Sequence, residues 1–229
     1  MALTAGFWER FEGRVGRYDL LQHPFYQAWS KGELTQGELK EYAAEYWHHV
    51  SAFPTYLSAL HARMPDGETR REVLRNLAEE EGVDQPTGRA HSEMWMDFAV
   101  AMGASRDEVT ERVVQPEMAA LVETFRAMMQ EGSATTAMAA LYAYESKVPA
   151  IAKTKAEGLA SFYGTTGVGA GYFTLHETAD VAHASVWREL IGASCASAAE
   201  EEAALDAGER AAAALWGALD GVERERLGR

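Results

Sequence analysis

Hydrophobic residues recur along most of this chain at the three- and four-residue spacing of amphipathic helices. Leu39 to Val50 is typical of the pattern, and a capping box at Thr35–Glu38 precedes it. A second capping box occupies Ser105–Glu108. No segment shows the signals of a strand. We therefore predict an all-α fold, a compact helical bundle, with helices over about residues 7–21, 24–29, 35–60, 66–82, 133–163 (interrupted at Pro149) and 172–190, and others that begin near His91, Ser105 and Pro116.

The length and composition indicate one large domain and a distinct C-terminal segment. The chain has 229 residues, of which 47% are hydrophobic, and no linker divides it. Residues 1–195 hold the patterned helices. Residues 196–229 form an acidic, alanine-rich tail with few large apolar residues. This tail is either a docked final helix or an oligomer contact, and the pattern leaves both readings open.

Charge and cysteine content limit the partners and the compartment. The formal net charge of −14 argues against nucleic acid as a partner, because phosphate binding needs a basic surface. The N-terminus reaches charged residues too early for a signal peptide, and no apolar run approaches the roughly 20 residues of a membrane span. A single cysteine, Cys195, excludes an intramolecular disulfide. We expect a cytoplasmic protein without a membrane partner.

Two histidines and an aspartate give the first indication of chemistry. His176, Asp180 and His183 lie in a segment without Pro or Gly between Tyr172 and Leu190, which predicts a continuous helix. Residues four and seven apart return to nearly the same helix face. The two imidazoles and the carboxylate would then form one stripe, a ligand set suited to iron, manganese or zinc.

A second group of candidates lies around residue 80. Glu79, Glu80 and Glu81 cannot all face inward, since neighbours on a helix differ by about 100°. The apolar stripe through Leu77 is compatible with either Glu80 or Glu81, and pattern alone does not choose between them. His91 follows after a turn-rich piece, residues 82–88.

Glu145 lies on an apolar helix face between Leu141 and Val148, where a bare carboxylate is costly. Pro149 releases the backbone carbonyl four residues earlier and predicts a distorted turn there, a common setting for metal ligands.

Glu45, with His48 and His49, is a third acidic and imidazole-bearing place, for which we expect core and supporting roles. The economical hypothesis gathers three carboxylates and three imidazoles in one bundle core, enough for two first-row metals. A single cysteine excludes an iron–sulfur cluster and a zinc–cysteine site. Zinc with mixed ligands is not excluded, but it suits a site with so many carboxylates less well than iron or manganese does. The proposed set is Glu80, His91, Glu145, His176, Asp180 and His183.

Several segments also resemble, in the same order, the family of the chlamydial protein associating with death domains and its bacterial relatives. These are haem-oxygenase-like dimetal oxidases, related in fold to thiaminase II and to the last enzyme of pyrroloquinoline quinone synthesis. The resemblance covers about residues 20–192 and leaves the tail outside. It rests on His23-Pro-Phe-Tyr26-Gln-Ala-Trp29, Gly32-Glu-Leu-Thr35, Ala52-Phe-Pro-Thr-Tyr-Leu-Ser58, Asn76-Leu-Ala-Glu-Glu-Glu81, His91 with Trp95 and Phe98, Tyr142-Ala-Tyr-Glu145-Ser146, and His176-Glu-x-x-Asp180-x-x-His183.

The resemblance implies a haem-oxygenase-like bundle whose first glutamate ligand is Glu80 rather than Glu81, with the other five ligands at the positions proposed above. It further implies synthesis of 4-aminobenzoate for folate from the protein's own side chains. In that scheme Tyr26 supplies the ring and Lys155 the amino nitrogen, and the reaction can occur once per chain. A lysine donates nitrogen only when neutral, so the pKa of Lys155 should be lowered by burial or a nearby cation.

The implied cofactors are two first-row transition metal ions (Fe/Fe or Mn/Fe), O2 and an external reductant. No exogenous organic substrate is required, and we expect a homodimer.

Three alternatives remain at this point. The first is a dimetal oxygenase acting on an exogenous small amine, amino acid or fatty acid, with Tyr26 and Lys155 lining the pocket. The second is a metal-free enzyme like thiaminase II, disfavoured because its nucleophile is a cysteine and Cys195 lies at the edge of the matching region. The third is a non-enzymatic interaction protein, in which six buried ionisable groups would have no explanation.

Overall fold

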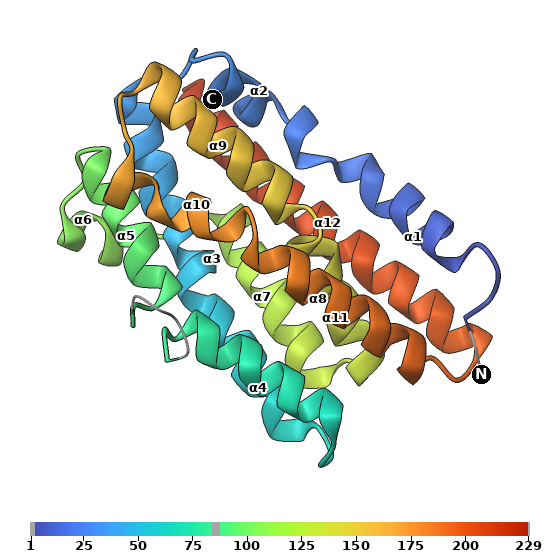
Figure 1. Ribbon diagram of the computed structural model, residues 1–229. Helices are drawn as coiled ribbons and strands as arrows, with labels where there is room; N and C mark the ends of the chain where they lie inside the picture. Colours follow the sequence, from blue (N-terminus) through green and yellow to red (C-terminus); the bar gives the residue numbers. More distant parts are fainter. Residues whose placement is uncertain (1–2, 84–87, 229) are drawn as a thin grey trace.

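The computed structural model of the protein describes residues 3–83 and 88–228, and within them every regular element is a helix (Figure 1). The predicted all-α fold is confirmed. Short 3₁₀ turns at 16–18, 20–22 and 167–170 connect some of the α-helices. The α-helices are α1 (Phe7–Val15), α2 (Pro24–Ser30), α3 (Gln36–Arg63), α4 (Glu68–Glu80), α5 (His91–Ala101), α6 (Arg106–Thr110), α7 (Pro116–Glu131), α8 (Ala134–Glu145), α9 (Val148–Phe162), α10 (Gly171–His176), α11 (Ala179–Ser194) and α12 (Ala198–Arg226).

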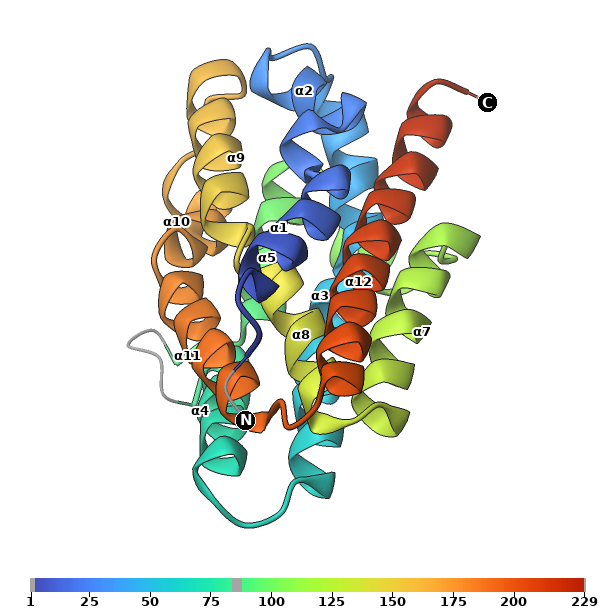
Figure 2. The same cartoon turned by 90° about the vertical axis from the view of Figure 1, so that its right-hand side faces the viewer.

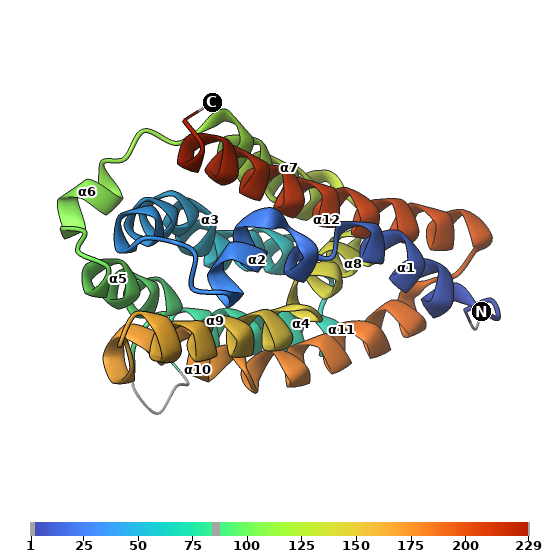
Figure 3. The same cartoon turned by 90° about the horizontal axis from the view of Figure 1, so that it is seen from above.

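Helices α3 and α8 form the centre of the bundle (Figure 3). On one side they pack against α7 and α12, and on the other against α4, α5 and α11, with α9 and α10 continuing that second side. Nearly every residue of α8 is buried, including its final residue Glu145. Polar side chains on the inner faces of α4, α5, α8 and α11 therefore meet in the interior rather than in solvent.

Local sequence signals explain where several helices begin. The Thr35 hydroxyl accepts a hydrogen bond from the Glu38 amide while the Glu38 carboxylate accepts from the Thr35 amide, so the predicted capping box is formed. Ser105 and Glu108 form the same box at α6. Both signals are local, which is why the sequence alone reveals them.

The helix boundaries differ from the predictions at three places. The segment 7–21 is helical only to Val15, because glycine lowers helix propensity at Gly16 and two 3₁₀ turns follow. The segment 133–163 divides at 146–147 rather than at Pro149, which occupies the first turn of α9. The segment 172–190 divides at 177–178, so the predicted continuous helix there is wrong.

The segment beyond residue 195 contains a long helix, α12, that packs along α8, α7 and α1 (Figure 2). Its buried stripe includes Leu205, Leu215 and Leu219, with small residues between them. Glu201 is buried and accepts hydrogen bonds from the Thr4 amide and hydroxyl. The tail is thus a docked helix of the same bundle.

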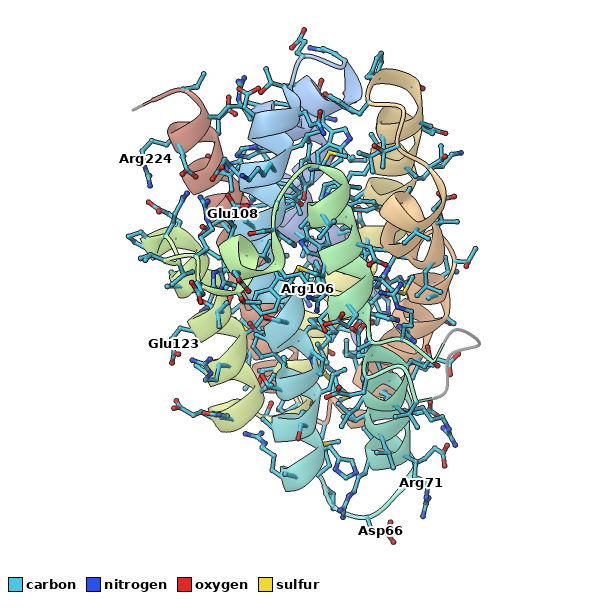
Figure 4. All side chains as sticks on the ribbon, turned by 90° about the vertical axis from the view of Figure 1, so that its left-hand side faces the viewer. Asp66, Arg71, Arg106, Glu108, Glu123 and Arg224 are labelled. Atoms are coloured by element: carbon cyan, nitrogen blue, oxygen red, sulfur yellow. The ribbon has the colours of Figure 1, made fainter. Side chains whose placement is uncertain are left out.

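Charged residues lie mainly at the periphery. Figure 4 shows Asp66 and Arg71 extending outward at the junction of α3 and α4, with a 3.3 Å ion pair between them. Across residues 3–83 and 88–228, none of the helices is both long and apolar enough to cross a membrane.

Candidate metal centre

The six predicted metal ligands converge from five helices into two neighbouring groups. In each group the donor atoms lie within 4.8 Å of one another, and all six side chains are buried. Their contacts include 3.0 Å between Glu80 Oε2 and His91 Nδ1, and 3.3 Å between His183 Nδ1 and Asp180 Oδ1. The first group is Glu80, His91 and His176; the second is Glu145, Asp180 and His183.

The end of α4 decides which glutamate faces the cluster. Glu80 is 5% exposed, whereas Glu81 points to solvent. The helix ends in a Schellman motif, in which the amide of Val83 donates to the carbonyl of Ala78 and Gly82 has a positive φ of 75°. A Cβ at Gly82 would lie 2.3 Å from the backbone of Arg89, so glycine lets the two ends of this connection approach. The predicted turn at 82–88 falls partly on residues 84–87, which lie outside the described ones.

The helix is broken at 177–178, between His176 and Asp180, and these two residues belong to different ligand groups. His176 is the last residue of α10, where the partial negative charge of the helix end favours a cationic side chain. Asp180 lies in the first turn of α11, where the partial positive charge of the helix end favours an anionic side chain. The Thr178 hydroxyl bonds back to the carbonyl of Leu175, a local alternative to helix continuation. The predicted stripe on one continuous helix is therefore wrong: Asp180 and His183 belong to one group and His176 to the other, although His176 and Asp180 line the same small cavity.

Polar neighbours orient two of the predicted ligands. Glu145 accepts a 2.5 Å hydrogen bond from the indole of Trp187 and a 3.3 Å bond from the amide of Asn76. His176 Nδ1 lies 2.7 Å from the carbonyl of Tyr172, so this nitrogen carries the proton and Nε2 is left to face the group.

The electrostatics of the cluster fit a cation. Burial, aided by the carboxylates of Asp180 and Glu80, raises the pKa of Glu145 to about 8. Burial lowers the pKa of His183, but Asp180, Glu145 and Glu79 outweigh it and raise that pKa to about 10. His91 Nδ1 lies 3.0 Å from Glu80 Oε2, and its Nε2 has no hydrogen-bond partner among the described residues. Converging carboxylates and imidazoles match the donor chemistry of divalent iron or manganese.

Lys155 lies in a separate buried cage of aromatic rings. Its Nζ is 2.8 Å from the hydroxyl of Tyr26 and 2.6 Å from that of Tyr42, and the two hydroxyls are 3.1 Å apart. Burial lowers the Lys155 pKa well below its ordinary value, and among the described residues no charged neighbour contributes to the shift. Burial therefore favours the neutral amine. Four further rings surround it: Trp29, Tyr46, Trp95 and Phe173.

The His23-Pro24 motif positions Tyr26. The ring Nδ1 of buried His23 accepts from the amide of Phe25 and caps α2, and Pro24 occupies the first helical position. The other ring nitrogen lies 3.2 Å from Asp220 and ties α2 to α12.

A close approach of α9 to α2 places Lys155 opposite Tyr26. A Cβ at Gly158 would lie 2.7 Å from the indole of Trp29, so only glycine permits this packing. The same indole donates to the backbone carbonyl of Lys155.

Two small cavities lie in the core, one beside the aromatic cage and one beside the metal ligands. One, of about 20 Å³, is lined by Tyr26, Lys155, Tyr144 and Tyr172 among others. The second, of about 10 Å³, is lined by Glu80, Glu145, His176 and Asp180, and it shares Tyr144 and Tyr172 with the first. Each has room for about one molecule the size of water.

Sequence reasoning missed several neighbours of these residues. Tyr42 reads as an ordinary core position, and only its contact with Lys155 distinguishes it. The pattern gives Glu79 no role beside Glu80 and Glu81, yet its carboxylate lies 2.8 Å from His183 Nε2. Glu45 instead accepts from Arg112 and from the Gln115 amide, which is a structural role, and His49 lies among aromatic rings.

Comparison with known proteins identifies relatives over most of the chain. A family described as iron-containing redox enzyme, of haem-oxygenase type, matches residues 40–217. A 4-aminobenzoate synthase of Nitrosomonas europaea is 38% identical over 96% of this chain and 92% of its own. A 4-aminobenzoate synthase of Chlamydia muridarum is 37% identical over 95% of this chain and 90% of its own.

The fold is likewise shared with solved structures. A TenA homologue from Pseudomonas syringae aligns with a TM-score of 0.82 at 17% identity, covering 95% of this chain and 93% of that one. Both the alignments and the family match extend into α12, beyond the residue 192 at which the sequence resemblance was expected to stop.

Proposed function

This chain belongs to the family of iron-containing redox enzymes with the haem-oxygenase-like fold, and from that premise we propose that it makes 4-aminobenzoate from its own side chains. Tyr26 would supply the ring and Lys155 the amino nitrogen. The two buried groups of ligands would hold two first-row metals, Fe/Fe or Mn/Fe. O2 and an external reductant complete the proposed reaction.

The contact between Lys155 and Tyr26 is the observation that carries the proposal. The nitrogen lies 2.8 Å from the tyrosine oxygen and 4.3 Å from the ring centroid, so it is near the ring carbon that bears the hydroxyl. Burial keeps the amine neutral and leaves its lone pair available as a nucleophile. The neighbouring Lys153, by contrast, is exposed and lies 4.0 Å from Glu157.

The atoms of the product match the atoms of these two side chains. 4-Aminobenzoate has an amino group para to a carboxylate, and tyrosine has a hydroxyl para to its Cβ. The conversion breaks the Cα–Cβ bond of Tyr26, where Cα takes up a proton and residue 26 becomes glycine, and it oxidises Cβ to the carboxylate carbon. It also breaks Cε–Nζ of Lys155, which leaves Cε as an aldehyde carbon, and forms a Cζ–Nζ bond in place of Cζ–Oη, whose oxygen leaves as water. O2 is the oxidant: four electrons from Cβ, two from Cε and two from the reductant would reduce two O2 to water.

The protein's own residues would hold the reacting groups in place. When bound, the two metals would supply the O2-dependent oxidation that cleavage of an aliphatic carbon–carbon bond requires. The Tyr42 hydroxyl accepts a 2.6 Å hydrogen bond from Lys155 Nζ and so restrains the amine beside Tyr26. The aromatic cage separates the amine from bulk solvent.

The size of the interior cavities supports an internal substrate over an exogenous one. Pockets for organic ligands usually have roughly 300–1,000 Å³. The cavities beside Lys155 and beside the metal ligands have only about 20 and 10 Å³. A free amino acid or fatty acid would need the aromatic cage to open, whereas Tyr26 is already inside it.

The test compares four single variants of the full-length protein, each loaded with Fe(II) and Mn(II) without O2 and then exposed to O2 with a reductant. The wild type should release at most one 4-aminobenzoate per chain. Tyr26→Phe and Lys155→Arg should release none. Tyr42→Phe, a matched tyrosine control, should release product at a lower rate, and Lys153→Arg should match the wild type.

Two results would contradict the proposal. One is release of 4-aminobenzoate by the Tyr26→Phe variant. The other is many products per wild-type chain, which would identify an exogenous substrate. Metal uptake and thermal unfolding of each variant show whether a loss of product reflects chemistry or misfolding.

A further inference from the structure

The side chain of Glu79 touches the metal-ligand groups from outside. It precedes Glu80 on α4 and is about one-third exposed, unlike Glu80, which faces the interior. Its Oε2 lies 2.8 Å from Nε2 of His183, the last predicted ligand on α11. Helices α4 and α11 are in contact here, as Figures 1 and 2 also show.

The two ring nitrogens of His183 face different surroundings. Nδ1 is directed at the second group, 3.3 Å from Asp180 Oδ1 and 3.9 Å from Glu145 Oε2. Nε2 is directed at Glu79. If Nε2–H donates to Glu79, the lone pair of Nδ1 faces the two carboxylates, as a metal ligand must. An imidazole ligand usually donates its second N–H to a carboxylate or a carbonyl, which fixes the ring and its tautomer.

His183 needs such a restraint because there is space beside it. A cavity of about 170 Å³ opens between α4 and α11 and is lined by Asn76, Glu79, His183 and Trp187 among others. Without a partner on Nε2, the imidazole has room to turn toward this cavity and away from Asp180. By contrast, His176 is held by the backbone carbonyl of Tyr172 and stacks on its ring at 4.0 Å.

We propose that Glu79 is a positioning residue for the second metal site: it holds His183 with Nδ1 toward Asp180 and Glu145 and thereby sets the affinity of that site alone. This inference rests on the proposed dimetal centre. It assigns the two sites different supports, a side-chain carboxylate for His183 and a main-chain carbonyl for His176.

The test is an anaerobic titration of the full-length, metal-depleted protein with Mn(II), in which free ion is followed by electron paramagnetic resonance. The wild type should bind two ions. Glu79→Ala should weaken one of the two sites by about 10- to 100-fold, and leave the other within about twofold. Glu79→Gln, which keeps an acceptor oxygen, should show a smaller loss. Glu81→Ala, an exposed carboxylate on the same turn, is the matched control and should bind like the wild type.

Double variants identify the affected site. In a His183→Ala background, Glu79→Ala should cause no further loss, whereas in a His91→Ala background it should cause the full loss.

Three outcomes would overturn the role of Glu79: wild-type affinity in Glu79→Ala, equal weakening of both sites, or an additive loss on top of His183→Ala. Because no O2 is present, the titration does not depend on product formation. Wild-type uptake of fewer than two ions would contradict the dimetal centre as well as the role of Glu79.

Discussion

The metal-ligand groups and the Lys155 cage both bury ionisable side chains, but the two regions differ in what surrounds those side chains. Three carboxylates and three imidazoles face one another in the first region. In the second, a single amine meets only hydroxyls and aromatic rings. The metal-ligand groups bring together carboxylates whose negative charge a cation can balance. The Lys155 cage disfavours the charged form of its amine.

The difference accounts for the division of labour in the proposed reaction. Burial, aided by nearby carboxylates, raises the pKa of Glu145 to about 8. The carboxylates around His183 outweigh its burial and raise its pKa to about 10, so the metal-free cluster favours bound protons that divalent ions would replace. Within the described residues Lys155 has no anion beside it, and burial lowers its pKa and so favours the neutral amine that the proposed reaction needs. A cationic metal pair and an uncharged amine can therefore occupy the same core.

The largest expected effect comes from replacing the caged amine. Lys155→Met should abolish 4-aminobenzoate release and yet raise the unfolding free energy by about 1–2 kcal/mol at pH 7, because a buried amine that the unfolded chain protonates is replaced by an apolar side chain. Thermal unfolding and product analysis of one preparation check both parts. Lys153→Met, at an exposed position on the same helix, should change neither. A Lys155→Met protein less stable than the wild type would contradict the claim that burial of this amine destabilises the fold.

Removal of the metals should have the next largest effect, which is a stability of the fold that falls as the pH rises. The pKa of Glu145 rises from 4.5 to about 8 on folding, and that of His183 from 6.5 to about 10. The folded chain thus retains protons that the unfolded chain releases, and stability falls as the pH rises through this range.

Each proton that only the folded chain retains changes the free energy of unfolding by about 1.4 kcal/mol per pH unit. For a chain of this size, a change of 1 kcal/mol shifts the midpoint of thermal unfolding by about 2–4 °C. The chelated protein should therefore unfold several degrees lower at about pH 9 than at about pH 6, and Mn(II) should flatten this slope. Equal pH profiles with and without Mn(II) would show that the cluster does not bind it.

A smaller effect is expected from Trp187, whose indole donates to Glu145. Trp187→Phe should weaken metal binding by about tenfold, because loss of a partner to a ligating carboxylate typically costs that much. The anaerobic Mn(II) titration measures it. Trp47→Phe, on α3, serves as the control. An unchanged affinity in Trp187→Phe would indicate that the indole contributes only packing.

The sequence predicts the helical fold and most of the cluster because the signals for both are local or periodic. The apolar residues around Glu145 on its helix face predict from the sequence alone that this carboxylate is buried. The choice of Glu80 over Glu81 depends on where α4 ends and turns, which the pattern does not define. The break between His176 and Asp180 contains neither Pro nor Gly, so propensity cannot reveal it.

Residues in three-dimensional contact were harder to predict. Lys153 and Lys155 look alike in the sequence, and only the packing of α9 against α2 makes the second one buried. Tyr42 and Glu79 contact functional candidates across long sequence separations, which no motif encodes.

The most direct test of the central claim follows the atoms themselves. Protein is produced with ¹³C in the tyrosine rings and ¹⁵N at the lysine Nζ, loaded with metals, and exposed to O2 and reductant in unlabelled buffer. We predict that the released 4-aminobenzoate carries both labels, at no more than one per chain, and that peptide mass mapping finds losses at Tyr26 and Lys155 only. Unlabelled product, or labelled product from chains whose Tyr26 and Lys155 remain whole, would contradict the account.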